Sequence, residues 1–283
     1  MIPAATVESV VRAALAEDAP WGDVTSESLL PEGSQAVAEL AAREPGILAG
    51  AGVFAAAMHA VDPSIEVELL LADGEAFAAG ALLARVSGDA RGILRAERVG
   101  LNLVQRLSGI ATETARYVAA VAGTRARIVD TRKTTPGLRA LERHAVRCGG
   151  GHNHRFSLSD AVLAKDNHLA VLTRGGRDLT EALREARERL GHTVHFEVEV
   201  DRVDQIEPVI AAGIDTIMLD NFTPEQLREG VAIVAGRALV EASGGVSLAT
   251  VAEIAATGVD VISVGALTHS VRSLDLGLDV VVR

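Results

Sequence analysis

Short apolar runs recur along the second half of the chain, and each ends in charged or small polar residues. The six runs are residues 126–133, 161–168, 194–200, 216–221, 238–245 and 261–267. Segments with helical spacing, such as 178–190 and 224–235, lie between most of them. Strands that alternate with helices at intervals of about 20 to 35 residues are typical of βαβ units in a parallel sheet. We therefore predict an α/β fold with a closed or nearly closed barrel, with an open doubly wound sheet as the alternative.

The first half of the chain lacks this regular alternation. Apolar positions between residues 7 and 14 follow helical spacing, with Thr6 as the expected N-cap. The expected strands are residues 37–43, 65–71 and part of 74–86. Residues 91–121 predict a long helix that is broken near Ser108 and Gly109.

Composition limits the function classes that fit the chain. Of the 283 residues, 48% are hydrophobic, and the formal net charge is −11. An acidic chain of this kind argues against a nucleic acid or an anionic membrane as partner, because both require an electropositive face. Cys148 is the only cysteine, so an intrachain disulfide is excluded and a reducing compartment fits.

The sequence contains no signal for secretion or membrane insertion. The first 17 residues have neither the basic nor the apolar region of a secretory signal. The longest uncharged stretch, residues 45–61, is interrupted by glycines and His59 and is shorter than the roughly 20 apolar residues that span a bilayer. We expect a cytoplasmic protein.

Basic residues are distributed unevenly. Lysine occurs only twice, as Lys133 and Lys165, although the chain has 27 basic residues. The segment from Arg125 to Arg155 holds eight basic side chains against two acidic ones. A local excess of positive charge in an acidic chain attracts an anion. A solvated helix face explains part of this segment, but not Arg132 and Lys133, which directly follow an apolar run.

Unusual residues cluster where the six predicted strands end. They are Asp130, Arg132, Lys133, Lys165, Asp166, Asn167, His168, Glu199, Asp220, Asn221, Glu241, Ser243, Gly244 and Gly265. The carboxyl ends of parallel strands meet at one edge of the sheet, where the active sites of α/β enzymes lie. We therefore expect these side chains to form one site for small, strongly anionic molecules.

Two pairs of signals refine this expectation. Glu199 and Asp220 follow consecutive strands, so they could hold a hydrated Mg²⁺ or ribose hydroxyls, or pair with nearby cations. The small residues of 243–245 and 265–269 follow the last two strands and precede helices. Backbone N–H groups in such turns can bind a phosphate.

Three glycines, residues 149–151, follow Cys148 and precede His152, Asn153, His154 and Arg155. Glycines allow the backbone to approach a ligand closely. A zinc site or a thiol nucleophile would need further ligands at matched spacing, which the sequence does not offer. We therefore interpret Cys148 as a small buried residue.

Several of these motifs together resemble the quinolinate phosphoribosyltransferase family. The most specific are Asp130-Thr131-Arg132-Lys133-Thr134 and Gly149-Gly150-Gly151-His152-Asn153-His154-Arg155, joined by Lys165-Asp166-Asn167-His168, Glu197-Val198-Glu199, Leu219-Asp220-Asn221 and Glu241-Ala242-Ser243-Gly244-Gly245. The resemblance extends over nearly the whole chain. Two departures are His144, where tyrosine is common, and Phe156-Ser157 after Arg155.

The resemblance implies a fold of two domains. Residues 1–108 would form an N-terminal α/β sandwich to which residues 273–283 return. Residues 109–272 would form an incomplete α/β barrel of parallel strands. It also implies a homodimer or larger assembly, in which Arg98 enters the neighbouring subunit's site.

The implied reaction joins quinolinate to phosphoribosyl pyrophosphate with decarboxylation, in the biosynthesis of NAD, and requires Mg²⁺. By resemblance, quinolinate would bind Arg98, Thr131, Arg132, His154, Arg155 and Lys165. Phosphoribosyl pyrophosphate would bind Lys133, Glu199, Asp220, Ser243, Gly244, Gly245, Gly265 and His269. Lys133, Lys165, Glu199 and Asp220 would be catalytic, with Mg²⁺ held through the pyrophosphate near Glu199 and Asp220.

Three other functions remain open from the sequence. A related phosphoribosyltransferase could act on another acid, a barrel lyase could form a Schiff base on Lys165 or Lys133, and a metabolite sensor could bind without turnover. The cations at Arg132, Arg155 and Lys165 favour quinolinate, because a second carboxylate needs the full set.

Overall fold

The computed structural model of the protein describes residues 2–281. Up to residue 120 its elements are α1 (Ala4–Asp18), α2 (Val24–Leu29), β1 (Gln35–Ala42), β2 (Gly46–Ile47), α3 (Ala51–Val61), β3 (Glu66–Leu69), β4 (Ala76–Phe77), β5 (Leu82–Asp89) and α4 (Ala90–Ala120). The later elements are β6 (Arg127–Val129), α5 (Arg139–Cys148), β7 (Val162–Ala164), α6 (Asp166–Leu172), α7 (Leu179–Glu188), β8 (Phe196–Val200), the 3₁₀ helix η1 (Val203–Gln205), α8 (Ile206–Ile210), β9 (Thr216–Asp220), α9 (Pro224–Val234), β10 (Leu239–Ser243), α10 (Val251–Ala255), β11 (Val261–Ser263), α11 (Ala266–His269) and β12 (Leu276–Val281).

The chain forms two compact units. The first contains the residues up to Ala115, Thr134–Gly150 and the residues from Leu267 onward. The second contains Arg116–Lys133 and Gly151–Ala266.

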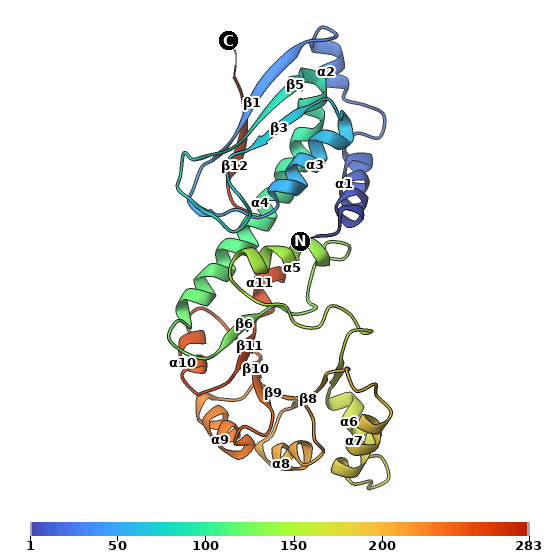
Figure 1. The fold of residues 1–283 in the computed structure, drawn as a ribbon, viewed down its shortest axis with the longest axis vertical. Coiled ribbons are helices and arrows are strands. Elements are labelled where there is room, and N and C mark those ends of the chain that lie inside the picture. The colour runs from blue at the N-terminus through green and yellow to red at the C-terminus, as the bar shows by residue number, and fades with distance from the viewer. Residues whose placement is uncertain (1, 282–283) are drawn as a thin grey trace. The chain divides into compact units, whose positions relative to one another are not determined.

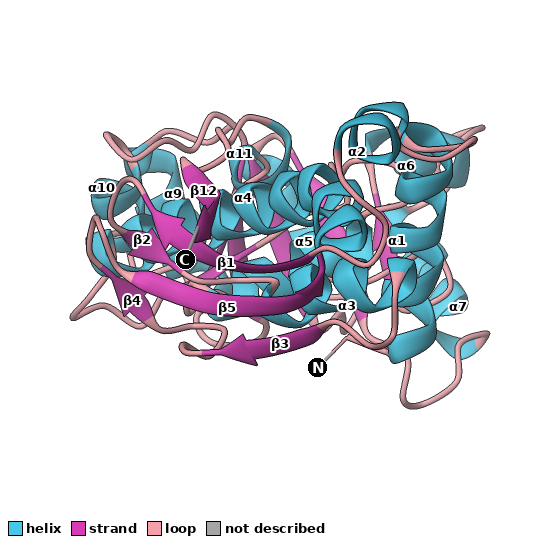
Figure 2. Cartoon of the chain, turned by 90° about the horizontal axis from the view of Figure 1, so that it is seen from above, coloured by secondary structure: helices cyan, strands magenta, loops and turns pink. Residues whose placement is uncertain are grey.

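An antiparallel sheet in the order β12-β1-β5-β3 forms the framework of the first unit (Figures 1 and 2). Along β1, Ala38, Leu40 and Ala42 are buried, while the residues between them are partly exposed. This alternation is typical of a sheet with one covered face. Phe54 of α3 and Ile93 of α4 belong to the core that covers it.

The second unit is built on a parallel sheet in the order β6-β11-β10-β9-β8-β7. Each of its six strands lies within one of the predicted apolar runs. Figure 1 shows α8, α9 and α10 on the outer side of the curved sheet. β6 and β7 form the two edges, so within residues 2–281 the sheet does not close. The incomplete α/β barrel implied by the resemblance is therefore confirmed.

Two local predictions in the first unit are wrong. The N-cap of α1 is Pro3, not Thr6, so the helix begins earlier than its apolar pattern indicated. Cys148 is partly exposed rather than buried, because it is the last residue of α5 and lies where that helix meets a turn.

The predicted break in the long helix is also wrong, because α4 runs without interruption through Ser108 and Gly109. A Cβ atom on Gly109 would overlap the backbone carbonyl of Arg272. The glycine therefore permits close packing against the segment that precedes β12, and does not end the helix. Among residues 2–281, no helix combines the length and apolar character that a membrane crossing requires.

A buried ion pair anchors the start of the segment Thr134–Gly150 within the first unit. The carboxylate of Glu142 is fully buried and accepts hydrogen bonds from Arg106 Nε at 2.8 Å and Arg106 Nη2 at 2.6 Å. The backbone N–H of Thr135 donates to the same carboxylate, and Arg106 also donates to the carbonyl of Thr268. One guanidinium thus ties three separate stretches of chain together.

Candidate active site

Polar side chains of the second unit share one face of the parallel sheet. The register pairs Glu199 of β8 and Glu241 of β10 with the same residue of β9, Met218. Two residues further along, Asp220 of β9 pairs with Ser243 of β10. Because successive side chains of a strand point to opposite faces, these four polar side chains lie on the same one. The sheet therefore collects them as the strand-end pattern predicted.

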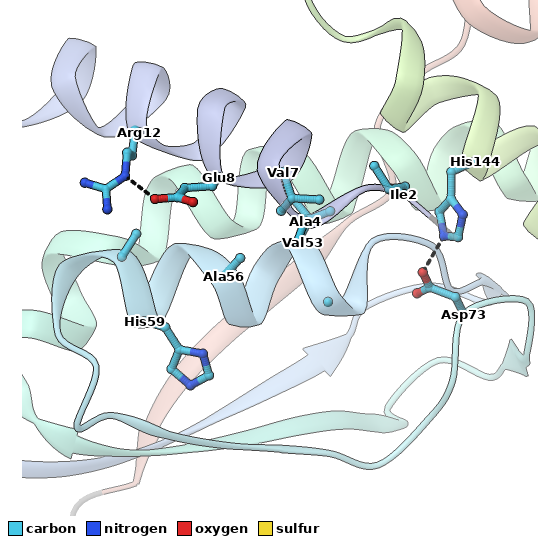
Figure 3. Close-up of a pocket in the computed structure, with 12 residues that line it drawn as sticks. Ile2, Ala4, Val7, Glu8, Arg12, Val53, Ala56, His59, Asp73 and His144 are labelled. Carbon is cyan, nitrogen blue, oxygen red and sulfur yellow. Dashed lines mark hydrogen bonds and ion pairs between the residues drawn. The ribbon is translucent and has the colours of Figure 1, made fainter.

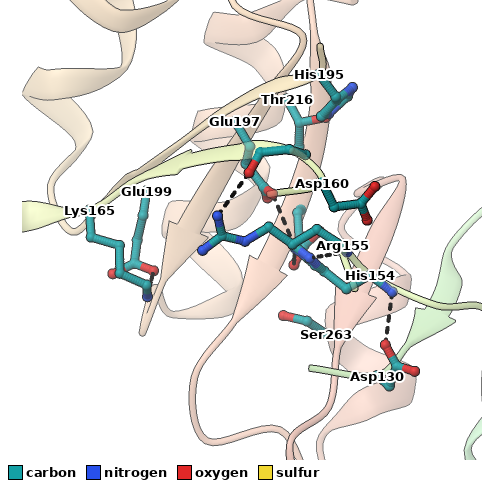
Figure 4. A network of polar contacts seen from close by, with 12 residues as sticks. Asp130, His154, Arg155, Asp160, Lys165, His195, Glu197, Glu199, Thr216 and Ser263 are labelled. Atoms are coloured by element: carbon teal, nitrogen blue, oxygen red, sulfur yellow. Dashed lines mark hydrogen bonds and ion pairs between the residues drawn. The ribbon is translucent and has the colours of Figure 1, made fainter. Parts of the chain in front are cut away.

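Lys165 is the first of the predicted cations on this face. It directly follows β7, and its Nζ atom lies 2.5 Å from Oε2 of Glu199 (Figure 4). The Glu199 side chain is mostly buried, whereas that of Lys165 is nearly half exposed. The ion pair with a nearby cation, which the sequence left open, is thus present at Glu199. At Asp220, Oδ2 accepts a hydrogen bond from the Asn221 side chain at 2.7 Å.

His154 lies between two buried carboxylates (Figure 4). Its Nε2 atom is 3.0 Å from Glu197 Oε2 and 3.6 Å from Glu241 Oε1. Its Nδ1 atom accepts a hydrogen bond from the backbone N–H of Arg155 at 2.7 Å. A neutral His154 therefore carries its proton on Nε2, where it faces the carboxylates.

Both His154 and Glu241 hold protons more tightly than usual. Burial, together with the negative charge of Glu197, raises the pKa of Glu241 to about 8. Burial opposes a charged His154, but the hydrogen bond to Glu197 and the charges of Glu241, Glu197 and Asp130 outweigh it and raise the pKa of His154. Near neutral pH, Glu241 therefore retains a proton, and this proton relieves the repulsion between the two carboxylates.

This cluster predicts a pH dependence of stability. A carboxyl group whose pKa rises on folding contributes stability that is fully present below its unfolded value, near 4.5, and is lost as the pH rises through about 8. The raised pKa of His154 acts in the same direction. We expect the melting temperature to fall between pH 6 and pH 9, and the fall to be smaller in Glu241→Gln, whose amide cannot ionise. Thermal unfolding across this range measures both, and equal slopes in the two proteins would contradict the assignment.

Asp130 orders the loop that carries His154 and Arg155. Its carboxylate is fully buried and accepts hydrogen bonds from the His154 backbone N–H at 2.8 Å and from the Asn153 side chain at 2.5 Å. The loop also continues the sheet, because the backbone of His152 bonds to β6. Both carboxylate oxygens of Asp130 therefore bind the loop and hold it in position.

Two guanidinium groups of the second unit, those of Arg132 and Arg155, interact electrostatically. Arg155 Nη1 donates to the backbone carbonyl of Ala161 at 2.9 Å, which fixes the side chain. Burial and then the positive charge of Arg132 lower the pKa of Arg155. The negative charges of Glu197 and Asp160 act in the opposite direction and offset part of this repulsion. Two guanidinium groups in one region suit the binding of a carboxylate or phosphate.

The turn after β10 requires its glycines. Gly244 and Gly245 have φ angles of +90° and +60°, which L side chains rarely adopt. A Cβ atom on Gly244 would also overlap the side chain of Asn221. Asn221 has a φ of +59° and donates its backbone N–H to the carbonyl of Ser243 at 2.8 Å. The ends of β9 and β10 are thus locked together beside Asp220.

The remaining predicted site residues have these positions. In the second unit, the hydroxyl of Thr131 accepts a hydrogen bond from the Lys133 backbone N–H at 3.1 Å, and Gly265 directly precedes α11. In the first unit, the Arg98 side chain is mostly exposed, 3.8 Å from Glu97, and His269 Nδ1 is 2.5 Å from the Ser270 hydroxyl.

Two cavities in the second unit touch this set of residues. Arg155 lines a cavity of about 650 Å³ whose other walls are mainly apolar, including Phe196 and Leu163. Glu199 lines a second cavity of about 430 Å³, together with Asp166 and Arg202. Space for small molecules therefore lies beside both an arginine and a carboxylate of the predicted site.

Sequence reasoning placed Asp130 and Glu241 among the polar residues at the strand ends but gave them no role, and it did not include Glu197 in that set. A signal for Glu197 was present, since Glu197 and Glu199 occupy alternate positions of one strand and so share a face. No signal in the sequence indicates the contact of Glu241 with His154, which comes from a distant segment. That Asp130 binds the loop rather than a ligand depends on contacts that spacing does not reveal.

The carboxylates, cations and glycine turns at the carboxyl ends of parallel strands define an α/β enzyme for anionic small molecules. Comparisons with known proteins show to which family of such enzymes the chain belongs. Residues 110–279 match the family model "Quinolinate phosphoribosyl transferase, C-terminal domain", and residues 23–108 match the model of the N-terminal domain. The chain belongs to the quinolinate phosphoribosyl transferase family.

Individual relatives agree with this membership. The nicotinate-nucleotide pyrophosphorylase [carboxylating] of Mycobacterium leprae is 45% identical over 278 aligned residues, and the alignment covers 95% of this chain and 95% of the relative. A probable enzyme of the same name from Bacillus subtilis is 44% identical over 93% of this chain and 90% of its own length. The solved nicotinate-nucleotide pyrophosphorylase of Francisella tularensis is similar with a TM-score of 0.92 at 38% identity, covering 99% of this chain and 98% of that one.

Proposed function

We propose that this chain transfers the phosphoribosyl group of phosphoribosyl pyrophosphate to quinolinate with decarboxylation, a step of de novo NAD biosynthesis. The products are nicotinate mononucleotide, pyrophosphate and CO₂. The observation that carries the proposal is the cavity of about 650 Å³ lined by Arg155, whose guanidinium also interacts electrostatically with Arg132. Family membership supplies the identity of the reaction.

The second carboxylate of quinolinate explains why so many cations are present. A charge-assisted hydrogen bond contributes roughly 1.5–3 kcal/mol, so several are needed to hold a hydrated dianion. The groups proposed to bind quinolinate are Arg98, Thr131, Arg132, His154, Arg155 and Lys165. Arg98 would act across the interface of a homodimer or larger assembly, and its exposed guanidinium supports such a role. We also propose that the protein works in the cytoplasm.

The proposed groups for phosphoribosyl pyrophosphate are Lys133, Glu199, Asp220, Ser243, Gly244, Gly245, Gly265 and His269. Glu199 and Asp220 suit ribose hydroxyls, because carboxylates accept hydrogen bonds from them. They also suit Mg²⁺, which prefers oxygen ligands, and they lie on the same face of adjacent strands. Mg²⁺ bound to the pyrophosphate would neutralise part of its charge. The backbone turn at Gly244 supplies N–H groups for the 5′-phosphate.

The reaction needs electrostatic stabilisation more than a protein nucleophile. The ring nitrogen of quinolinate attacks C1 of the ribose as the bond to pyrophosphate breaks, and the pyrophosphate leaves with the electron pair. Lys133 and Lys165 are the compact cations proposed to stabilise the charges that develop. The ring nitrogen is then cationic, so the electron pair left on the neighbouring carbon by loss of CO₂ is stabilised until a proton replaces it.

A radiochemical assay tests the proposal directly. The purified protein with Mg²⁺ and carboxyl-labelled quinolinate is expected to release labelled CO₂ only when phosphoribosyl pyrophosphate is added. Nicotinate, which lacks the second carboxylate, is the matched control and is expected to be a poor substrate. Absence of CO₂ release would contradict the proposal. Turnover of a different acid would show that this acid, and not quinolinate, is the substrate.

A further inference from the structure

A second cluster of reactive side chains lies in the first unit. Nε2 of His144 is 2.7 Å from Asp73 Oδ2 and 3.4 Å from the sulfur of Cys148. The carboxylate oxygen, the ring nitrogen and the sulfur all lie within 4.8 Å of one another. His144 and Cys148 are one turn apart on α5, and Asp73 comes from the turn between β3 and β4. None of the three belongs to the proposed substrate site.

The geometry differs from that of an activated cysteine nucleophile. In such an arrangement the thiol and the carboxylate bind opposite nitrogens of the imidazole, so that the proton can be relayed through the ring. Here the carboxylate of Asp73 and the sulfur of Cys148 both contact Nε2, so the two groups share one proton on that nitrogen. Three ligand-type atoms converging on a single proton position resemble a metal site in which a proton occupies the place of the ion.

The side chains of the cluster are held in this arrangement. Oδ1 of Asp73 accepts a hydrogen bond from the backbone N–H of Ala51 at 2.9 Å, which turns Oδ2 toward His144. The end of α5 packs closely against α4, since a Cβ atom on Gly149 would overlap the carbonyl of Ala111. This close packing holds the end of α5 in place. Support of this kind orients metal ligands and raises their affinity.

We propose that Asp73, His144 and Cys148 bind a zinc ion. Imidazole nitrogen, thiolate sulfur and a carboxylate oxygen are the ligands that zinc uses in proteins. Around a tetrahedral ion, nitrogen and sulfur ligands lie roughly 3.5 Å apart and nitrogen and oxygen ligands roughly 3.3 Å apart. The His144–Cys148 separation already fits, and the His144–Asp73 separation needs to open by about 0.6 Å when the ion replaces the proton.

A cavity gives the ion access and a place for a fourth ligand. His144 and Asp73 line a cavity of about 540 Å³ in the same unit, together with Glu8 and His59 (Figure 3). About a fifth of the His144 side chain and a quarter of that of Asp73 are exposed. A water molecule can therefore complete the coordination from this side.

Zinc competes with protons at this site. The hydrogen bond to Asp73, followed by the one to Cys148, raises the pKa of His144 to about 9. Zinc must displace that proton and the thiol proton, so binding releases protons and weakens as the pH falls. Bound zinc would join α5 to the turn that carries Asp73 and so stabilise the first unit.

Cobalt substitution tests the proposal in the full-length protein. Metal-free protein in excess Mg²⁺, which occupies oxygen-ligand sites, is titrated with Co²⁺. One equivalent is expected to produce the near-ultraviolet band of a cobalt–thiolate bond, and Zn²⁺ is expected to remove it. The band reports one position, because Cys148 is the only cysteine. Zn²⁺ should also raise the melting temperature and block modification of the thiol.

Variants identify the ligands. Cys148→Ser is expected to lose the band, and Asp73→Asn and His144→Tyr to weaken Co²⁺ binding at least ten- to a hundred-fold, the loss that even an outer-shell partner causes. His59→Ala is the matched control, because His59 lines the same cavity outside the cluster. Circular dichroism confirms folding of each variant. The proposal is overturned if folded unmodified protein gives no thiolate band, or if the band is unaffected by Asp73→Asn and His144→Tyr.

Discussion

Replacing Arg155 with alanine is expected to lower kcat/KM for quinolinate roughly thirty- to several-thousand-fold. Loss of one partner from a desolvated charge pair costs about 2–5 kcal/mol, and each 1.4 kcal/mol is a factor of ten. Arg155 is well placed for such an effect, because it lines a cavity and because burial, followed by the charge of Arg132, lowers its pKa. Steady-state kinetics with quinolinate varied and phosphoribosyl pyrophosphate saturating measure the change.

Two further variants separate charge from shape. Arg155→Lys keeps the charge but loses the planar fork, so an intermediate activity is expected. Arg228→Ala removes an exposed arginine of the same unit that pairs with Glu225, and is expected to leave kcat/KM unchanged. If Arg155→Ala and Arg228→Ala behaved alike, Arg155 would have no part in binding the acid.

Among the substitutions proposed, Glu142→Ala is expected to cause the largest decrease in the free energy of unfolding. Its carboxylate is fully buried, and its removal leaves Arg106 and the Thr135 N–H without their shared acceptor. Breaking a buried pair from one side costs about 3–5 kcal/mol. For a chain of this size the melting temperature should fall by roughly 6–20 °C, which differential scanning calorimetry measures.

An exposed ion pair with similar geometry provides the control. Glu207 accepts hydrogen bonds from both Nη atoms of Arg237 at 2.8 and 2.6 Å, but its side chain is 60% exposed. Glu207→Ala is expected to cost less than about 1 kcal/mol. Equal destabilisation by the two substitutions would mean that burial is not what makes the Glu142 pair important.

The parallel sheet could be predicted from the sequence because its signal is local. Each strand is a short apolar run with a polar end, and these ends identified Lys165, Glu199 and Asp220 before any contact was known. The family motifs identified Arg132 and Arg155 from the sequence as well. The roles of these residues remain predictions, since contacts within the chain do not show what they bind.

Features that depend on distant contacts could not be predicted. Gly109 has the sequence appearance of a helix break, and only the carbonyl of Arg272 explains why a glycine is needed there. His144 lies one helical turn before Cys148, but the approach of Asp73 to this pair could not be predicted, because Asp73 belongs to a remote turn. Closure of the barrel was equally undetermined, since pairing between β6 and β7 depends on geometry and not on the pattern within either strand.

The pairing of β12 with β1 has a consequence for biosynthesis. During translation, β1 leaves the ribosome before β12, which covers one of its edges and follows the other described strands in the chain. Until then β1 has unpaired backbone groups along that edge, the feature by which nascent chains associate wrongly. The sheet of the first unit can therefore be completed only after the strands of the second unit have been synthesised.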